Sequence, residues 1–215
     1  MDTHLSTAIP ANGLPWTQSL HTGDARMDET HKEFTDMLNE ILGTPQDQQL
    51  PLYQKFLQHT VEHFAQEERW MVATGFSAEN CHAEHHNTIL ETMRAVQVHY
   101  EAGDTEIITR LAEALAEWFP GHAASMDAGL AQHMKNVGFD AVTETVADPS
   151  KIQSVTMSGC GSVSCSHRPL SDLQAGAQLC FEHLAVVVLG QRIHKFVTLG
   201  ALESRNVRHA MRIQL

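Results

Sequence analysis

The chain has 215 residues and a formal net charge of −12, with 26 Asp and Glu against 14 Lys and Arg. An acidic chain argues against nucleic acid as a partner. No run of 18 uncharged apolar residues occurs, and the start MDTHLSTAIP lacks the basic and apolar regions of a secretion signal, so we expect no membrane insertion and a cytoplasmic location. Residues 1–150 carry 7 basic against 23 acidic side chains, whereas residues 151–215 carry 7 against 3, which predicts two units.

The first 26 residues are rich in Pro and Gly and predict an extended N-terminal arm, with Trp16 and Leu20 as its anchors. Apolar residues then recur at helical spacing over residues 27–43, 48–73, 78–102 and 104–134. Pro120 and Gly121 should kink the fourth helix without ending it. Four helices with short connections predict a mainly α fold, an up-down-up-down four-helix bundle over residues 27–136.

The helical period fades after the bundle, so residues 137–158 are interpreted as a linker. Residues 159–215 predict a small β-rich tail, because FEHLAVVVLG, RIHKFVTLG and VRHAMRIQL are typical of short strands between Gly-containing turns. The order P-L-S-D-L-x-x-G followed by T-L-G resembles the SH3-like domain of ferrous-iron transport A proteins. That resemblance implies a protein-interaction or iron-linked module, so we expect a protein partner through the tail.

Cysteine and histidine side chains in the tail leave three alternatives open. A zinc or iron–sulfur site is one, although C-x4-C-x-H lacks the tight C-x2-C spacing; its ligands would be Cys160, Cys165, His167, Cys180 and His183. A redox pair of Cys160 and Cys165 is the second. The third is a Gly/Ser-rich loop with reduced thiols.

The bundle carries side chains that are typical metal ligands. His63 with Glu67, and His82 with His86, are i, i+4 pairs, and residues four apart share one face of a helix. The fourth helix adds a histidine and a carboxylate five residues apart, about 140° round an ideal helix, so we expect these two not to share one spot. The predicted metal ligands are His31, His63, Glu67, His82, His86, His122 and Asp127.

Each of these residues also has a simpler interpretation, since a single histidine on an apolar face is more often part of the core. The complete set favours a metal, because buried imidazoles and carboxylates without partners would each cost several kcal/mol. Imidazole and carboxylate together suit iron, zinc, manganese or copper better than calcium or magnesium. Five other histidines are interpreted as bystanders. His59 extends the row one turn before His63, and His85 points about 100° away from His86. His21, His99 and His133 lack partners at useful spacing.

With these residues placed, segment 16–134 resembles the bacterial hemerythrins. The arm contains the pattern W-x3-L-x-T-G-x4-D-x2-H, through Trp16, Leu20, Thr22, Gly23, Asp28 and His31. It is followed by H-F-x2-E-E from His63, by H-x3-H from His82 and by W-x3-H-x4-D from Trp118. A ferritin-like carboxylate bundle is the rival, but its Glu-x-x-His motifs would lie on the wrong helices here.

The resemblance implies a non-haem di-iron centre, with an oxo or hydroxo bridge, that binds dioxygen reversibly. It assigns one iron to three histidines, His82, His86 and His122. It assigns the second iron to His31 and His63, with a vacant position for dioxygen. Glu67 and Asp127 would bridge the two ions.

The resemblance also implies an apolar wall round the dioxygen site, formed by Phe34, Phe64 and Trp118. The chain departs from the family at Ala123, where a large aliphatic residue is usual, and this predicts faster autoxidation. The function could be that of an oxygen carrier or store, or that of an oxygen or redox sensor. A di-iron redox enzyme that handles peroxide or nitric oxide is the alternative, but no acid/base pair stands out, so we expect no enzyme.

Overall fold

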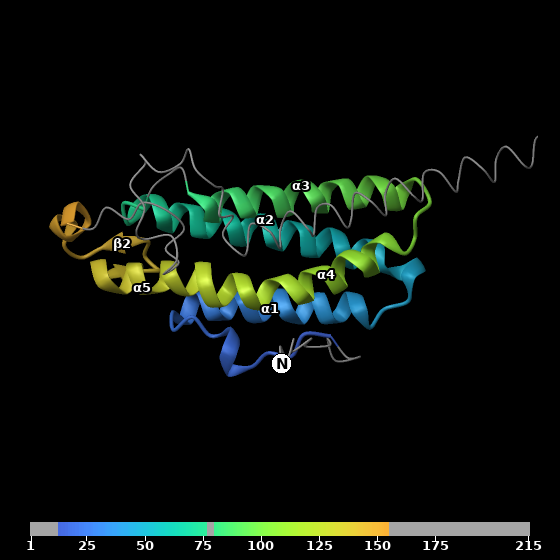
Figure 1. The fold of residues 1–215 in the computed structure, drawn as a ribbon, viewed down its shortest axis with the longest axis horizontal. Helices are drawn as coiled ribbons and strands as arrows, with labels where there is room; N and C mark the ends of the chain where they lie inside the picture. The colour runs from blue at the N-terminus through green and yellow to red at the C-terminus, as the bar shows by residue number, and fades with distance from the viewer. Residues whose placement is uncertain (1–12, 77–79, 155–215) are drawn as a thin grey trace, which may run out of the picture.

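The protein is described here as a computed structural model, which describes residues 13–76 and 80–154. Four long helices lie side by side along its longest axis (Figure 1). The helical elements are η1 (Gln18–Leu20), α1 (Ala25–Leu42), η2 (Gln46–Gln48), α2 (Gln49–Ala73), α3 (Cys81–Glu101), α4 (Ile107–His122), the π-helical η3 (Ala123–Asp127), α5 (Ala128–Val137) and η4 (Pro149–Ser154), and the strands are β1 (Phe139–Asp140) and β2 (Thr145–Val146).

Each helix of the bundle packs on the next one in the chain, and α4 returns to pack on α1. The connections are only a few residues long, so neighbouring helices run in opposite directions. The prediction of a mainly α, four-helix bundle is therefore confirmed. In the part of the chain that the structure describes, no helix is long and apolar enough to cross a membrane.

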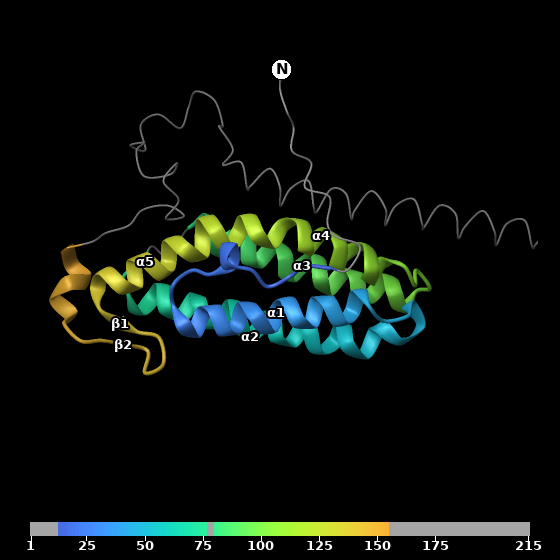
Figure 2. The same ribbon diagram turned by 90° about the horizontal axis from the view of Figure 1, so that it is seen from below.

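Side chains of α1 hold the arm against the bundle. Asn39 accepts a hydrogen bond from the backbone N–H of Leu14 at 2.7 Å and donates one to its carbonyl at 2.8 Å. Figure 2 shows this part of the chain lying against the bundle between α1 and α4. Leu20 is buried and Trp16 is partly buried against the same core, as their interpretation as anchors expects.

Helix α1 begins two residues earlier than the apolar pattern predicts. Asp24 is its N-cap, and its side chain accepts hydrogen bonds from the backbone N–H groups of Arg26 and Met27. The next carboxylate, Asp28, instead accepts from the backbone N–H and the hydroxyl of Thr22 in the arm. These contacts fix where the arm turns into the first helix.

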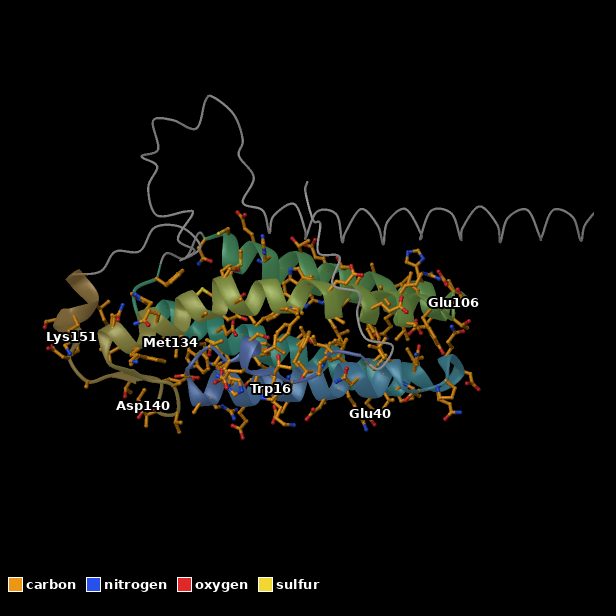
Figure 3. All side chains as sticks on the ribbon, turned by 60° about the horizontal axis from the view of Figure 1, so that its bottom comes forward. Trp16, Glu40, Glu106, Met134, Asp140 and Lys151 are labelled. Atoms are coloured by element: carbon orange, nitrogen blue, oxygen red, sulfur yellow. The ribbon has the colours of Figure 1, made fainter. Side chains whose placement is uncertain are left out.

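Two apolar clusters fill the bundle. The larger cluster lies between α1, α2, α3 and α4 and contains four of the Phe side chains that the structure describes, namely Phe34, Phe56, Phe64 and Phe119. The smaller one is defined by Met27, Trp70, Met71, Phe76, Leu130, Ala131, Met134 and Ala141, and we call it the methionine–tryptophan cluster. Figure 3 shows Glu40 and Glu106 toward one end of the bundle and Asp140 and Lys151 at the other, where the chain continues beyond α5.

The chain beyond α5 differs from the linker that the sequence predicts over residues 137–158. Gly138 ends α5 in the left-handed conformation, with φ of 70°, and the antiparallel pair β1–β2 follows with Phe139 opposite Val146. Arg69 of α2 donates hydrogen bonds to both carboxylate oxygens of Glu144, and the ring of Phe139 lies 6.5 Å from that of Trp70. Residues 139–147, which we call the hairpin, thus pack on the bundle. The β-rich, SH3-like tail and its cysteines lie outside the described residues.

Candidate metal centre

Helices α2 and α3 each present one pair of predicted ligands at the expected spacing. His63 and Glu67 are both buried on α2, and the Nε2 atom of His63 lies 2.8 Å from Oε1 of Glu67. His82 and His86 are both fully buried in the first turns of α3, which begins after the N-cap Asn80. The other carboxylate oxygen of Glu67, Oε2, lies 3.2 Å from Nε2 of His82 and 3.5 Å from Nε2 of His86. One carboxylate therefore faces histidines of both helices.

The fourth helix supplies its two predicted ligands through a change in helical type. Residues Ala123–Asp127 form a π-helical turn, in which Ala128 N–H bonds to the carbonyl of Ala123. A wider turn brings residues five apart onto one face, and Nε2 of His122 lies 3.2 Å from Oδ1 of Asp127. The expectation that these two residues do not share one spot is therefore wrong, because it assumed an ideal α-helix. The helix continues through Pro120 to His122 before the π turn begins.

Helix α1 contributes a fully buried imidazole, that of His31. Its Nε2 atom lies 3.2 Å from Oδ2 of Asp127 and 3.6 Å from Oε1 of Glu67. All seven predicted ligands thus converge at one place in the bundle. Their assignment as ligands stays a prediction.

The convergent side chains form two groups, and the donor atoms within each group lie within 4.8 Å of one another. One group is Glu67, His82, His86, His122 and Asp127, and the other is His31, His63 and Glu67. The carboxylates of Glu67 and Asp127 both lie between the three-histidine side and the two-histidine side. Oε2 of Glu67 and Oδ1 of Asp127 face the three-histidine side, whereas Oε1 and Oδ2 face His31 on the other side. This is the arrangement that two adjacent cations bridged by two carboxylates require.

The hydrogen-bonding state of these atoms fits a metal. Several of them are buried without a hydrogen-bond partner within the described part of the chain, namely Nε2 of His31 and His82, Oε2 of Glu67 and both oxygens of Asp127. A buried polar atom left in this state costs about 1–3 kcal/mol. All of them point to the centre of the cluster, where a metal would use them as ligands, so the donor set fits a pair of metal ions with nitrogen and oxygen ligands.

Burial and the charges of neighbouring groups shift the pKa values of the histidines and carboxylates at the centre when no metal is bound. Burial opposes a charge on His31 and His82, but the negative carboxylates of Asp127 and Glu67 lie close to both rings, outweigh it and raise the pKa of His31 to about 10 and that of His82 to about 9. Burial and the neighbouring positive His82 hold the pKa of His86 well below its usual range. Burial opposes the charge on both carboxylates too, yet the surrounding histidines keep their pKa values well below the ordinary range. Without metal, protons thus take the place of the cations.

Aromatic rings enclose the centre. Phe64 stacks on His86 with ring centroids 3.8 Å apart and an interplanar angle of 2°, and Trp118 stacks on His122 at 4.4 Å. Phe34 stacks on Phe119 at 4.5 Å. The resemblance places the rings of Phe34, Phe64 and Trp118 in the wall of a dioxygen site, and that role stays a prediction.

Two side chains next to the centre were not predicted as site residues. Phe119 lies edge-on to His31, with ring centroids 5.1 Å apart, and its only signal in the sequence is that it follows Trp118 on an apolar face. His85 is buried with its ring 6.3 Å from that of His122, although it belongs to neither group of ligands. Ala123, the first residue of the π turn, is buried as well.

The predicted bystanders lie outside both ligand groups. His133 is buried and donates a hydrogen bond to the carbonyl of Thr74 at 3.0 Å, so it ties α5 to the end of α2. His59 lies one turn before His63 at the edge of an open pocket of about 350 Å³ between α1 and α2. His63 also lines this pocket, so the two-histidine side lies next to solvent-accessible space.

Comparison with known proteins matches residues 22–133 to the Hemerythrin HHE cation binding domain. A bacteriohemerythrin of Ralstonia nicotianae is 33% identical over 134 residues, which cover 62% of this chain and 98% of the relative. A bacteriohemerythrin of Pseudomonas aeruginosa is 25% identical over 142 residues, covering 64% of this chain and 90% of the relative. The matched segment contains all seven convergent side chains.

Proposed function

The chain belongs to the hemerythrin family, and from this premise we propose that its bundle holds a non-haem di-iron centre that binds dioxygen reversibly. The sharing of Glu67 and Asp127 between the two groups of histidines carries the proposal. Two buried carboxylates that each direct one oxygen to either side suit a pair of ions better than a single one.

The two irons would have unequal numbers of histidine ligands. His82, His86 and His122 would hold one iron, and His31 and His63 the other, with both carboxylates as bridges. A ferrous pair supplies the two electrons that reversible dioxygen binding requires. The side with two histidines has fewer protein ligands, so a small molecule has room there, and the pocket between α1 and α2 reaches His63 on this same side.

The aromatic rings would control what happens at the open side. Phe119 lies against His31, and Phe34 lies against Phe119 and His63, so this side of the centre has an apolar cover that keeps bulk water away. A dry wall disfavours the escape of charged reduced oxygen species and so favours reversible binding. Stacking of Phe64 and Trp118 on His86 and His122 holds these two imidazoles in one orientation, which a rigid ligand set requires.

Within this function we favour an oxygen or redox sensor over a carrier or store. The hairpin contacts α2 through Arg69, two residues from Glu67, and follows directly from α5, which begins after Asp127. One of the two shared carboxylates thus lies on α2, which the hairpin contacts, and the other directly precedes α5, which the hairpin follows. Removing residues 159–215 tests the sensor: altered dioxygen affinity would show coupling to the tail, whereas unchanged affinity and kinetics would favour the carrier.

A di-iron redox enzyme that handles peroxide or nitric oxide is the second candidate. Ala123 favours it, because this buried residue beside His122 is small where a large aliphatic residue is usual in the family. A wall with less apolar bulk would admit water or a larger ligand more easily. A ferric product formed without any detectable oxygenated state would support this candidate.

The first experiment is to purify the protein, count bound iron and record absorption spectra in the reduced, oxygenated and deoxygenated states. Two irons per chain with an oxygenated spectrum that disappears when oxygen is removed are expected. Glu67→Gln should reduce the iron content, because it removes a shared charged ligand, whereas His59→Gln, one turn earlier on α2, should keep both ions. Zinc or no metal in the wild-type protein, or full iron in Glu67→Gln, would contradict the proposal.

A further inference from the structure

The methionine–tryptophan cluster borders the metal centre on the side of the hairpin. Met27 lies four residues before His31 on α1, and Met71 lies four residues after Glu67 on α2. Residues four apart on a helix share a face and differ in height by about one turn, or roughly 5–6 Å. Two thioethers on different helices therefore lie next to ligands of the centre.

The two methionine side chains differ in their orientation relative to the metal centre. Long side chains on a helix lean toward its N-terminus, so Met71 leans toward Glu67, whereas Met27 leans away from His31. Met71 is also held in place, because Nδ2 of Asn80 donates a hydrogen bond to its sulfur at 3.5 Å. Only 3% of Met71 is exposed, so the side chain is largely closed to bulk solvent. An oxidant formed inside the bundle therefore has easier access to Met71 than one in bulk solution.

We propose that Met71 is a site of sulfoxidation by hydrogen peroxide formed at the metal centre, an inference that rests on the proposed function. When the oxygenated centre autoxidises, dioxygen takes one electron from each ferrous ion and two protons from solvent and becomes hydrogen peroxide. The sulfur of Met71 then attacks one peroxide oxygen. An S–O bond forms and the O–O bond breaks, while the sulfur loses two electrons and the second oxygen leaves with both protons as water.

The product changes the packing of the hairpin. A sulfoxide is polar and larger than a thioether, and it would stand among the buried side chains that Ala141 and Phe139 contact. Loss of this packing loosens the hairpin and exposes its contacts on α2. Methionine sulfoxide is reduced again by dedicated reductases, so the modification is reversible. Oxidation at the metal centre would thus change the packing of the hairpin, through Met71, in the part of the chain that leads to the tail.

The test follows sulfoxide at each methionine by peptide mass spectrometry. The full-length ferrous protein is taken through cycles of air and re-reduction with catalase present, which removes peroxide from the bulk solution. Met93 is the matched control, because it is fully buried but lies seven residues from the nearest ligand of its helix, His86. Met37 is the control for bulk peroxide, because it is partly exposed.

Sulfoxide is expected to form at Met71 at least about fivefold faster than at Met93 or Met37. Equal rates at Met71 and Met93, or faster oxidation of Met37, would overturn the inference. In the zinc-loaded protein treated with added peroxide, the order should reverse, with Met37 oxidised first. If Met71 is oxidised first there too, its modification does not depend on peroxide from the centre.

A second measurement tests the consequence. Hydrogen exchange of residues 139–147 should become about tenfold faster after the oxygen cycles in the wild-type protein. It should stay slow in Met71→Leu, which has a similar volume but no sulfur. Unchanged exchange in the oxidised wild type would overturn the link to the hairpin. Iron content and the oxygenated spectrum of the same sample separate the two proposals: if both are present and Met71 stays unmodified, only this inference fails.

Discussion

Raising the pH should destabilise the metal-free protein, because two histidines of the centre hold protons that the unfolded chain has released. Removal of metal by dialysis against a chelator leaves His31 with a pKa of about 10 and His82 with one of about 9, because Asp127 and Glu67 outweigh the effect of burial. Unfolded histidines ionise near pH 6.5. Between pH 7 and pH 9 the folded state therefore binds more protons than the unfolded state, and the free energy of unfolding falls as the pH rises.

The magnitude follows from the number of protons. A difference of one bound proton changes the free energy of unfolding by about 1.4 kcal/mol per pH unit, so two protons over two units set an upper limit near 5–6 kcal/mol. Unfolded histidines keep part of their protons at pH 7, and His82 has lost about half of its proton at pH 9, which lowers the expected change to about 4.5–5 kcal/mol. The two carboxylates contribute nothing in this range, because they are unprotonated in both states. His86 is unprotonated in the folded state and only partly protonated in the unfolded state at pH 7, so it opposes the change by no more than a few tenths of a kcal/mol.

The measurement is urea unfolding of the metal-free protein at pH 7, 8 and 9, followed by circular dichroism. The zinc-loaded protein is the control, because coordinated imidazoles carry no such proton at any of these pH values. Its stability should vary much less over the same range. A metal-free protein whose stability stays level or rises between pH 7 and pH 9 would show that the carboxylates do not hold these two protons.

Three substitutions test other contacts. Asn39→Ala removes both hydrogen bonds to Leu14 and should lower the unfolding free energy by about 1–2 kcal/mol in urea, with faster hydrogen exchange in the arm; unchanged exchange would show that Asn39 does not hold the arm. Tyr53→Phe removes the 2.6 Å hydrogen bond to the carbonyl of Met93 and should cost about 1 kcal/mol in thermal unfolding. Ala123→Ile should slow the decay of the oxygenated form, followed by absorption, and an unchanged rate would show that Ala123 does not control autoxidation.

The positions of the helices and four of the candidate ligands follow from periodicity. Apolar residues at helical spacing locate the four long helices, and the i, i+4 rule places His63 with Glu67 and His82 with His86. These are local properties of an ideal α-helix. They hold here because the packing of the bundle leaves α2 and α3 regular at the site.

Local rules fail where the backbone departs from the ideal helix. His122 and Asp127 share one spot because of a π turn, and such a turn has no sequence signal comparable with a cap or a proline. The first helix shows a smaller failure of the same kind, since the apolar pattern begins at Met27 but the cap Asp24 starts the helix earlier.

Contacts between segments that are distant along the chain could not be predicted from the sequence either. The hairpin has only two residues in each strand, too few for an alternating pattern, and it is held by Arg69 and Glu144, which lie 75 residues apart. Similarly, no sequence pattern predicts the hydrogen bond between Asn39 and Leu14 or the ring contact between Phe119 and His31. Such contacts depend on how the helices are placed in three dimensions.

The π turn serves the site and the packing of α5 at once. If the turn relaxed to a regular α-helix with all its residues kept, everything after it would rotate by about 100° relative to α4. The carboxylate of Asp127 would leave the site, and the same rotation would carry Leu130 and Met134 out of their cluster toward solvent. A substitution that favours the regular α-helix over the π turn would therefore weaken the fold and the metal centre together.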